Sequence, residues 1–124
     1  MPMTVLIVDD AEASVVTLEI ALDSLPGIEI VTVANASQAF RVLKERNVAA
    51  VITDIHMPHM DGFEFLARLR AAPGRRVPVL VVSGDSNPDT PAEAARLGAD
   101  GFFAKPYSPA KIRAAVARLL EQTV

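Results

Sequence analysis

Four short apolar runs in this 124-residue chain each end on polar residues that could do chemistry. Such runs are typical of buried parallel strands, and the carboxyl ends of parallel strands meet at one edge of a sheet. Side chains directly after them are therefore expected at that edge, close together. They are Asp9 and Asp10 after 5–8, Asp54 after 48–53, Ser83 after 77–82, and Lys105 after 101–104.

Three carboxylates, one hydroxyl and one ammonium group would converge at this edge. Carboxylates held together repel one another, and a hard divalent cation with oxygen ligands is the usual compensation. Mg²⁺ is the expected cofactor because it is typically held by one or two carboxylates, several waters and phosphate oxygens. Phosphoryl transfer needs mainly positioning and neutralisation of the transferring oxygens. The cluster therefore predicts a Mg²⁺-dependent phosphoryl site.

The elements that must position this cluster alternate along the chain. Strands are predicted over 5–8, 28–33, 48–53, 77–82 and 101–104, and helices over 11–25, 37–46, 61–71, 90–98 and from 108 onward. Asp61 and Thr90 are expected to cap two helices at their starts, and Asn47 to end a third. Five strand–helix units predict an α/β, doubly wound parallel sheet with helices on both faces and right-handed crossovers.

Length and composition bound the class of protein. The chain fits one domain over 1–124, and its hydrophobic fraction of 51% with only 5% aromatics suits strands packed under alanine-rich helices. A net charge of −3 predicts no direct nucleic-acid or membrane partner. The chain has no cysteine, and its first residues lack the features of a signal peptide, so we expect a cytoplasmic protein.

The polar residues and their surroundings closely resemble the response-regulator receiver family over essentially the whole chain. The motifs that carry the resemblance are Val5-Leu6-Ile7-Val8-Asp9-Asp10, Asp54-Ile55-His56-Met57-Pro58-His59-Met60-Asp61-Gly62, Ser83, and Gly98-Ala99-Asp100-Gly101-Phe102-Phe103-Ala104-Lys105-Pro106. The resemblance implies a receiver domain over 1–124 with a flavodoxin-like (βα)5 fold, a three-layer sandwich whose sheet has strand order 2-1-3-4-5. It also implies a phosphorelay switch of a two-component system. Self-phosphorylation and self-dephosphorylation would be its only chemistry, so no enzyme is expected.

The resemblance also assigns roles at the phosphoryl site. Asp54 would be the phosphoacceptor, taking its phosphoryl group from a histidine kinase or a histidine phosphotransfer protein. Asp10 and Asp54 would bind Mg²⁺ through their side chains and His56 through its backbone carbonyl, whereas Asp9 would act through a water. The residues His56 and Asp85 are less usual at positions where the family tunes access of water, so the phosphoryl lifetime does not carry over.

Three further residues would transmit the signal by the same resemblance. Lys105 would pair with a phosphoryl oxygen, Ser83 would move to bind it, and Phe102 would be an aromatic rotamer switch. The switch would alter the surface made by the helix over 90–98, the strand over 101–104 and the last helix. Because no output domain follows, we expect the activated form to bind a downstream protein, as a monomer or a weak phosphorylation-dependent dimer. If the chain is cut from a longer regulator, the expectation of a separate downstream protein does not follow.

Several of these residues also have simpler structural explanations. Asp54 could cap a turn and Ser83 could merely end its strand. Phe102 and Phe103 could alternate between core and surface on an edge strand. His56 and His59 have no third nitrogen or sulfur ligand spaced to join them, so no zinc site is expected.

Two other functional classes share parts of the pattern. Enzymes similar to the haloacid dehalogenases use a strand-end Asp with Mg²⁺, but they carry a second Asp two residues later, where this chain has His56. A flavin carrier would share the sheet topology, but its anionic phosphate needs hydroxyls and backbone amides rather than carboxylates.

One stripe on the predicted helix over 11–25 faces away from the expected core. Val15, Leu18 and Leu22 follow helical spacing on the inner face. An apolar stripe on the opposite face indicates an interaction surface, and we hypothesise that it docks the helical bundle that carries the donor histidine. This docking stripe comprises Ala13, Val16, Thr17 and Ile20.

Overall fold

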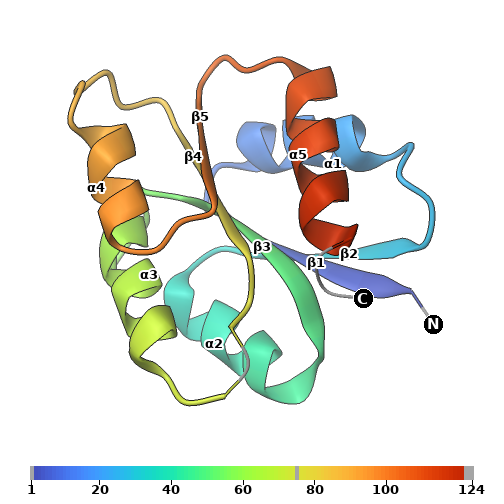
Figure 1. Cartoon of the computed structure of the whole chain (residues 1–124), viewed down its shortest axis with the longest axis horizontal. Coiled ribbons are helices and arrows are strands. Elements are labelled where there is room, and N and C mark those ends of the chain that lie inside the picture. Colours follow the sequence, from blue (N-terminus) through green and yellow to red (C-terminus); the bar gives the residue numbers. More distant parts are fainter. Residues whose placement is uncertain (1, 75, 122–124) are drawn as a thin grey trace.

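Strands and helices alternate along the chain in the computed structural model, which describes residues 2–74 and 76–121 (Figure 1). The strands are β1 (Met3–Val8), β2 (Ile28–Val33), β3 (Val48–Asp54), β4 (Val79–Ser83) and β5 (Gly101–Ala104). The helices are α1 (Glu12–Leu22), α2 (Ala36–Glu45), α3 (Gly62–Ala71), α4 (Thr90–Arg96) and α5 (Pro109–Glu121). All predicted elements are present, and the predicted ranges of β2 and β5 match the observed ones.

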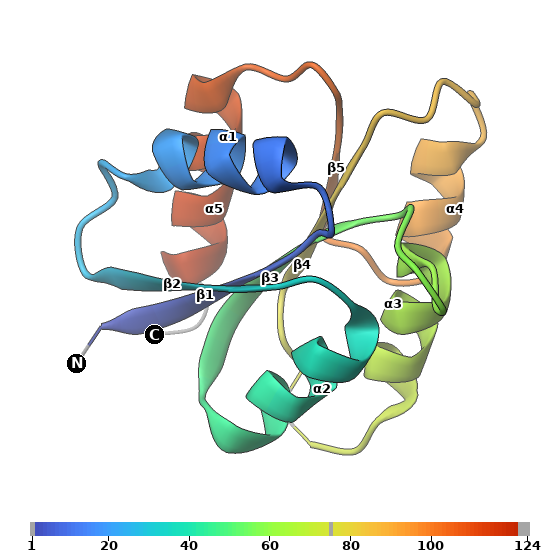
Figure 2. The same ribbon diagram turned by 180° about the vertical axis from the view of Figure 1, so that it is seen from behind.

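The five strands form one parallel sheet in the order β2-β1-β3-β4-β5. Helices α1 and α5 cover one face, and α2, α3 and α4 cover the other (Figures 1 and 2). The strands β3 and β4 are buried along their whole length, as expected for apolar runs sandwiched between helices. This arrangement confirms the predicted doubly wound, three-layer α/β fold.

Each face of the sheet has its own hydrophobic core. Leu18 of α1 and Ile112 of α5 are fully buried against the inner strands on one side. Phe65 of α3 is fully buried on the other side, where its ring makes an edge contact with Phe40 of α2 at 5.1 Å between centroids. These two cores hold the helices in place, so the strand ends and their polar residues have fixed positions.

Several predicted element ends need correction, among them the end of α1, which is at Leu22 rather than at 25. Asp89, not Thr90, is the N-cap of α4, and the hydroxyl of Thr90 instead donates to Asp85 Oδ2 at 3.2 Å. At the end of α2 the cap is Arg46, in extended backbone, so Asn47 does not supply the predicted cap. The strand β4 starts at Val79 rather than at 77, because Pro78 has no N–H to donate to a neighbouring strand.

The predicted cap of α3 is confirmed. Asp61 has extended backbone, and its Oδ1 accepts a hydrogen bond from Glu64 N at 2.8 Å. This bond satisfies one of the amides that a helix start leaves without a partner. The N-cap of α3 is therefore fixed seven residues after Asp54, where the loop returns to the sheet.

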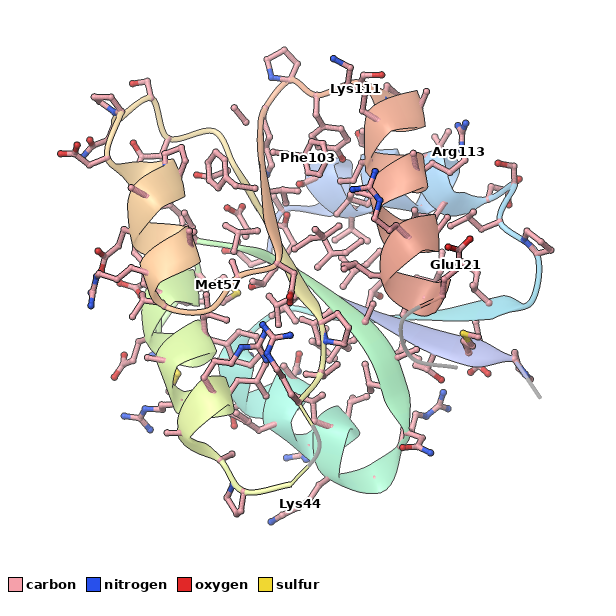
Figure 3. The ribbon with its side chains drawn as sticks, viewed as in Figure 1. Lys44, Met57, Phe103, Lys111, Arg113 and Glu121 are labelled. Carbon is pink, nitrogen blue, oxygen red and sulfur yellow. The ribbon has the colours of Figure 1, made fainter. Side chains whose placement is uncertain are left out.

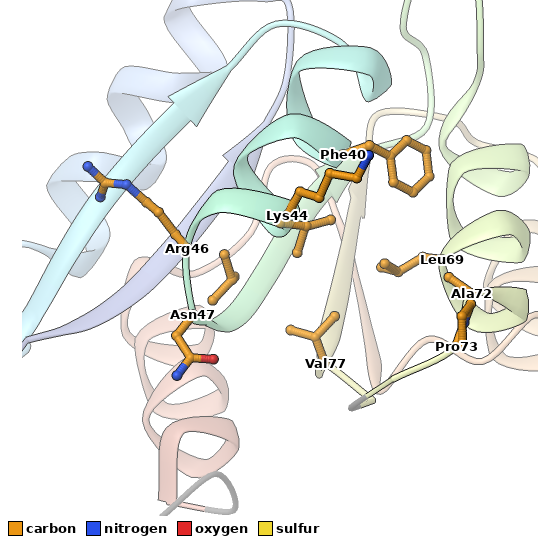
Figure 4. A pocket seen from close by; sticks show the side chains of 10 residues that line it. Phe40, Lys44, Arg46, Asn47, Leu69, Ala72, Pro73 and Val77 are labelled. Carbon is orange, nitrogen blue, oxygen red and sulfur yellow. The ribbon is translucent and has the colours of Figure 1, made fainter.

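A hollow of about 400 Å³ lies between α2 and α3, at the amino ends of β3 and β4 (Figure 4). Its lining is mainly apolar, with Phe40, Leu69 and Val77 among the contributors. Functional groups of open parallel sheets gather at the carboxyl ends of the strands, so this hollow is at the wrong edge for the predicted chemistry. Among the described residues, no helix is long and apolar enough to cross a membrane.

Candidate functional site

The carboxyl ends of β1, β3, β4 and β5 meet at one edge of the sheet, as the sequence predicted. Asp54 is the last residue of β3 and pairs in register with Val82 of β4, directly before Ser83. Asp9, Asp54 and Ser83 are all buried, with exposed fractions of 3%, 7% and 0%. The sheet therefore removes two carboxylates from water, which is costly unless they are paired.

Lys105 is the cation that pairs with both buried carboxylates. Its Nζ lies 3.2 Å from Asp54 Oδ2 and 3.6 Å from Asp9 Oδ2. The nearer of the two contacts is a hydrogen bond, whereas Asp9 Oδ2 is buried without any hydrogen-bond partner. One ammonium group thus faces two carboxylates, so the cluster keeps an excess negative charge and an oxygen able to accept another positive group.

The backbone of the β3–α3 loop orients Asp54. Its Oδ1 accepts a hydrogen bond from Ile55 N at 2.6 Å and a longer one from His56 N at 3.4 Å. The loop folds back so that Gly62 N donates to Ile55 O at 2.7 Å. A side chain at Gly62 would collide with the backbone carbonyl of Asp54, so glycine is required for this close approach.

Asp9 is held by its own loop. Its Oδ1 accepts a hydrogen bond from Ala11 N at 2.9 Å, just before α1 begins. This bond leaves the other oxygen directed at Lys105. The next residue, Asp10, is exposed, so the two adjacent acidic residues have different surroundings.

Two predicted participants lie at the margin of the cluster. Ser83 is completely buried, and its Oγ accepts a hydrogen bond from Asp85 N at 3.0 Å. The His56 side chain is 69% exposed, and its Nε2 lies 3.9 Å from Asp85 Oδ2. The imidazole therefore faces Asp85, not the buried carboxylates of Asp9 and Asp54. Of His56, only the backbone carbonyl was expected to bind metal.

The donor chemistry of this edge suits a hard cation. Among the described residues, no three Asp, Glu, His or Cys side chains form a ready-made metal cage. Mg²⁺ does not need such a cage, because it keeps several waters and often uses only one or two carboxylates. Two carboxylates with an unpartnered buried oxygen, together with exposed Asp10, therefore fit this ion.

The two phenylalanines of β5 lie on opposite faces of the sheet. Phe102 packs with the core on the α2–α3–α4 side. Phe103, labelled in Figure 3, packs with the core on the α1–α5 side. Both rings are half-buried, so the alternative of one core residue and one surface residue is wrong. The reason is that helices flank both faces of this edge strand.

Sequence reasoning missed Tyr107, which follows Lys105 and Pro106. Its hydroxyl is buried without a hydrogen-bond partner, and so is Ser14 Oγ of α1. Burial raises the pKa of Tyr107, and the nearby negative charge of Asp9 adds to the effect. Both residues line a hollow of about 410 Å³ that reaches Lys105. A polar residue directly after the lysine motif was the signal that could have indicated this hollow.

Comparisons with known proteins agree with this geometry. The response regulator receiver domain family matches residues 5–117. The sensory/regulatory protein RpfC of Xanthomonas campestris is 36% identical over 98% of this chain and 17% of its own length. The probable chemotaxis protein CheY of Rhizobium etli is 33% identical over 90% of this chain and 88% of its own length.

A solved structure agrees as well. The signal receiver domain of a signal transduction histidine kinase from Syntrophus aciditrophicus is 30% identical and has a TM-score of 0.86, covering 97% of this chain and 91% of that one. The chain spans half or less of the first curated relatives it matches. The match is to a signalling module. The chain belongs to the response regulator receiver domain family of two-component systems.

Proposed function

We propose that Asp54 accepts a phosphoryl group from a phosphohistidine on a histidine kinase or a histidine phosphotransfer protein. The observation that supports this most strongly is the position of Lys105 Nζ, 3.2 Å from Asp54 Oδ2 and 3.6 Å from Asp9 Oδ2. An ammonium group there can neutralise an oxygen of a phosphoryl group in transfer. The buried surroundings strengthen that interaction, because fewer waters screen it.

The Asp54 oxygens have different roles in this proposal. Oδ1 is engaged by Ile55 N and His56 N, so Oδ2, which faces Lys105, is the nucleophile. As its bond to phosphorus forms, the bond between phosphorus and the imidazole nitrogen breaks, and that nitrogen keeps the electron pair. Hydrolysis of the acyl phosphate by water restores Asp54. The chain's own chemistry is limited to these two steps.

Mg²⁺ would be held by the side chains of Asp10 and Asp54 and by the carbonyl of His56, with Asp9 binding through a water. The ion would supply positive charge to the transferring oxygens. With Mg²⁺ and Lys105 present, the phosphorylated site would carry a net charge of about −1, which the partly exposed edge can tolerate. The unpartnered Asp9 Oδ2 supports a role for Asp9 in accepting a metal-bound water.

Phosphorylation would change the surface made by α4, β5 and α5. We propose that Ser83 Oγ turns toward the phosphoryl group and that the half-buried ring of Phe102 changes its packing in response. Phe102 lacks a hydroxyl, so its switch would depend on packing alone and not on a hydrogen bond. A downstream protein would read the altered surface.

The donor would dock beside α1. The docking stripe of Ala13, Val16, Thr17 and Ile20 is exposed, and Val16 and Ile20 reach 45% and 69% exposure. The hollow that contains Ala13 and Thr17 extends to Lys105, so a helix seated on the stripe could present its histidine to Asp54. Exposed apolar side chains next to the site favour burial against a partner.

Phosphotransfer from candidate phosphorylated kinases tests the proposed chemistry. Wild type should become labelled in the presence of Mg²⁺, and Asp54→Asn should not, because the amide is not a nucleophile for this transfer. Chelation of the metal should abolish labelling of wild type. Persistent Mg²⁺-dependent labelling of Asp54→Asn would overturn the assignment.

The docking proposal has a separate test. Ile20→Glu places a charge in the stripe and should slow transfer from the kinase at least tenfold, while leaving phosphorylation by acetyl phosphate unchanged. Glu19→Gln, on the same exposed helix but outside the stripe, is the matched control. Equal loss with both phosphodonors would reject docking at this stripe.

A further inference from the structure

The loop between β4 and α4 is built around Asp85. The backbone N–H of Asp85 donates to Ser83 Oγ at 3.0 Å, and its side-chain Oδ2 accepts the hydroxyl hydrogen of Thr90 at 3.2 Å. Thr90 is the first residue of α4 and is 4% exposed. One residue thus connects the buried serine at the end of β4 with the buried start of α4.

Other hydrogen bonds make this connection stiff. Asp85 Oδ1 accepts from Asn87 N at 2.9 Å, and Asn87 O in turn accepts from Thr90 N at 3.1 Å. Asn87 Oδ1 also accepts from Asp89 N at 2.9 Å. Successive bonds of this kind fix the loop from Ser83 to Thr90, so a displacement at one end is transmitted to the other.

The two ends of α4 are held differently. No side chain caps its first turn, where the N-cap Asp89 makes no such bond. Just beyond its last turn, Gly98 O accepts hydrogen bonds from Arg70 at 2.8 and 3.0 Å and from Arg76 at 3.2 Å. The carboxyl end of α4 is therefore clamped, whereas its amino end is held through Thr90, by its hydroxyl bond to Asp85 and its backbone bond to Asn87 O.

We propose that Asp85 is a positioning residue that couples the Ser83 hydroxyl to the first turn of α4. When Ser83 Oγ turns toward a phosphoryl group, the Asp85 N–H loses its acceptor, and Asp85 no longer holds Thr90 in place. The helix then pivots about its clamped carboxyl end. The direction of this coupling rests on the proposed function. The hydrogen bond from the Thr90 hydroxyl to Asp85 Oδ2, which we call the tether, exists without phosphorylation.

The tether is tested first in the unphosphorylated protein, by amide hydrogen exchange in α4. Thr90→Val removes the hydroxyl and should speed exchange in the first turn roughly fivefold, the effect of losing one hydrogen bond. Thr90→Ser keeps the hydroxyl and should exchange like wild type. Asp85→Ala should speed exchange at least as much as Thr90→Val, because it also removes the acceptor for Asn87 N. Ser108→Ala, at the start of α5, should leave α4 unchanged. An exchange rate in the first turn of α4 of Thr90→Val that equals the wild-type rate would overturn the tether.

The coupling is tested with beryllofluoride and Mg²⁺ as the phosphoryl mimic. In wild type the mimic should speed exchange in the first turn of α4, and in Thr90→Val most of that response should be missing while the amide of Phe102 still responds. A full α4 response in Thr90→Val would overturn the coupling. No response anywhere in wild type would contradict the proposed function and the coupling together, although the tether could still pass its own test.

Discussion

Two clusters of three charges lie at opposite edges of the same sheet, and their charge balances are opposite. At the carboxyl edge one cation faces two carboxylates, and at the amino edges of β4 and β5 two cations face one carboxylate. We call them the Lys105 cluster and the Arg70 cluster. Their members are Lys105, Asp9 and Asp54 in the first, and Arg70, Arg76 and Asp100 in the second.

The hydrogen bonds of the Arg70 cluster are directed at backbone groups. Arg70 donates to Gly98 O and to Val77 O, the latter at 2.7 Å, and Asp100 Oδ2 accepts from Val79 N at 2.8 Å. Burial and, next, the neighbouring Arg76 lower the pKa of Arg70, while Asp100 acts in the opposite direction. This cluster joins the end of α3 to the starts of β4 and β5, so its role is structural.

The Lys105 cluster, in contrast, leaves a buried oxygen without a hydrogen bond and carries excess negative charge. Natural proteins tolerate such unsatisfied groups mainly where function requires them. The comparison teaches that charge pairing by itself does not identify a functional site. Both clusters carry a net charge, so the buried Asp9 oxygen without a hydrogen-bond partner is what distinguishes them, and four changes can break or sharpen this distinction.

Arg70→Met should have the largest effect. It removes the donors to Gly98 O and Val77 O, and we expect the free energy of unfolding to fall by about 3 kcal/mol in urea denaturation. Arg68→Met, on the same helix, breaks only an exposed pair with Glu64 and should cost less than about 0.5 kcal/mol. Similar losses in both variants would contradict a structural role for the cluster.

Asp100→Asn should have the next largest effect on stability. The Asp100 side chain is only 19% exposed, so neutralising it leaves Arg70 largely buried without its counter-charge, and a loss of about 2 kcal/mol in stability is expected. Phosphorylation by acetyl phosphate should continue in the folded variant. Glu29→Gln, which breaks an exposed pair with Arg46, is the control and should change stability little.

Mg²⁺ should stabilise wild type. Binding only to the folded state adds about 1.4 kcal/mol at a concentration ten times the dissociation constant, visible as a rise in Tm. Asp54→Asn should lose most of this rise, and Asp100→Asn should keep it. The measurement compares Mg²⁺ with NaCl at equal ionic strength, and an equal rise in all three proteins would argue against a metal site at the Lys105 cluster.

Asp9→Asn should have the smallest effect on stability, and it should raise the free energy of unfolding, whereas Arg70→Met and Asp100→Asn lower it. It keeps the acceptor for Ala11 N and removes one of two repelling carboxylates, so stability in Mg²⁺-free buffer should rise by about 1 kcal/mol at low salt. Added salt should reduce this gain, since it screens the repulsion that the substitution relieves. A loss of stability would mean that the pair with Lys105 outweighs the repulsion.

Most of the fold could be predicted from local patterns. Uninterrupted apolar runs indicated β1, β3 and β4, and the capping residue Asp61 placed the start of α3 correctly. The strand order came from the family resemblance, because periodicity says nothing about which strands are neighbours. Thr90 was misassigned as a cap because its hydroxyl found a partner five residues earlier, in the preceding loop.

The Arg70 cluster could not be predicted in the same way. Arg70 reaches Gly98 and Asp100 across 28 and 30 residues of sequence. An arginine on a helix is more often solvated, so its residue type does not indicate these contacts. Long-range hydrogen bonds depend on how helices pack on the sheet, which no local pattern reports. For the same reason the hollow at Tyr107 and the Asp85–Thr90 bond became visible only in three dimensions.

By itself the sequence determined that Asp9, Asp54, Ser83 and Lys105 lie at the carboxyl ends of strands and therefore meet at one edge, because parallel strands end on the same side. Only the tertiary structure decided how they meet. Lys105 contacts Asp54 across 51 residues and leaves Asp9 Oδ2 without a hydrogen bond. Sequence patterns report local conformation, whereas distances between remote side chains follow from the packing of the whole sheet.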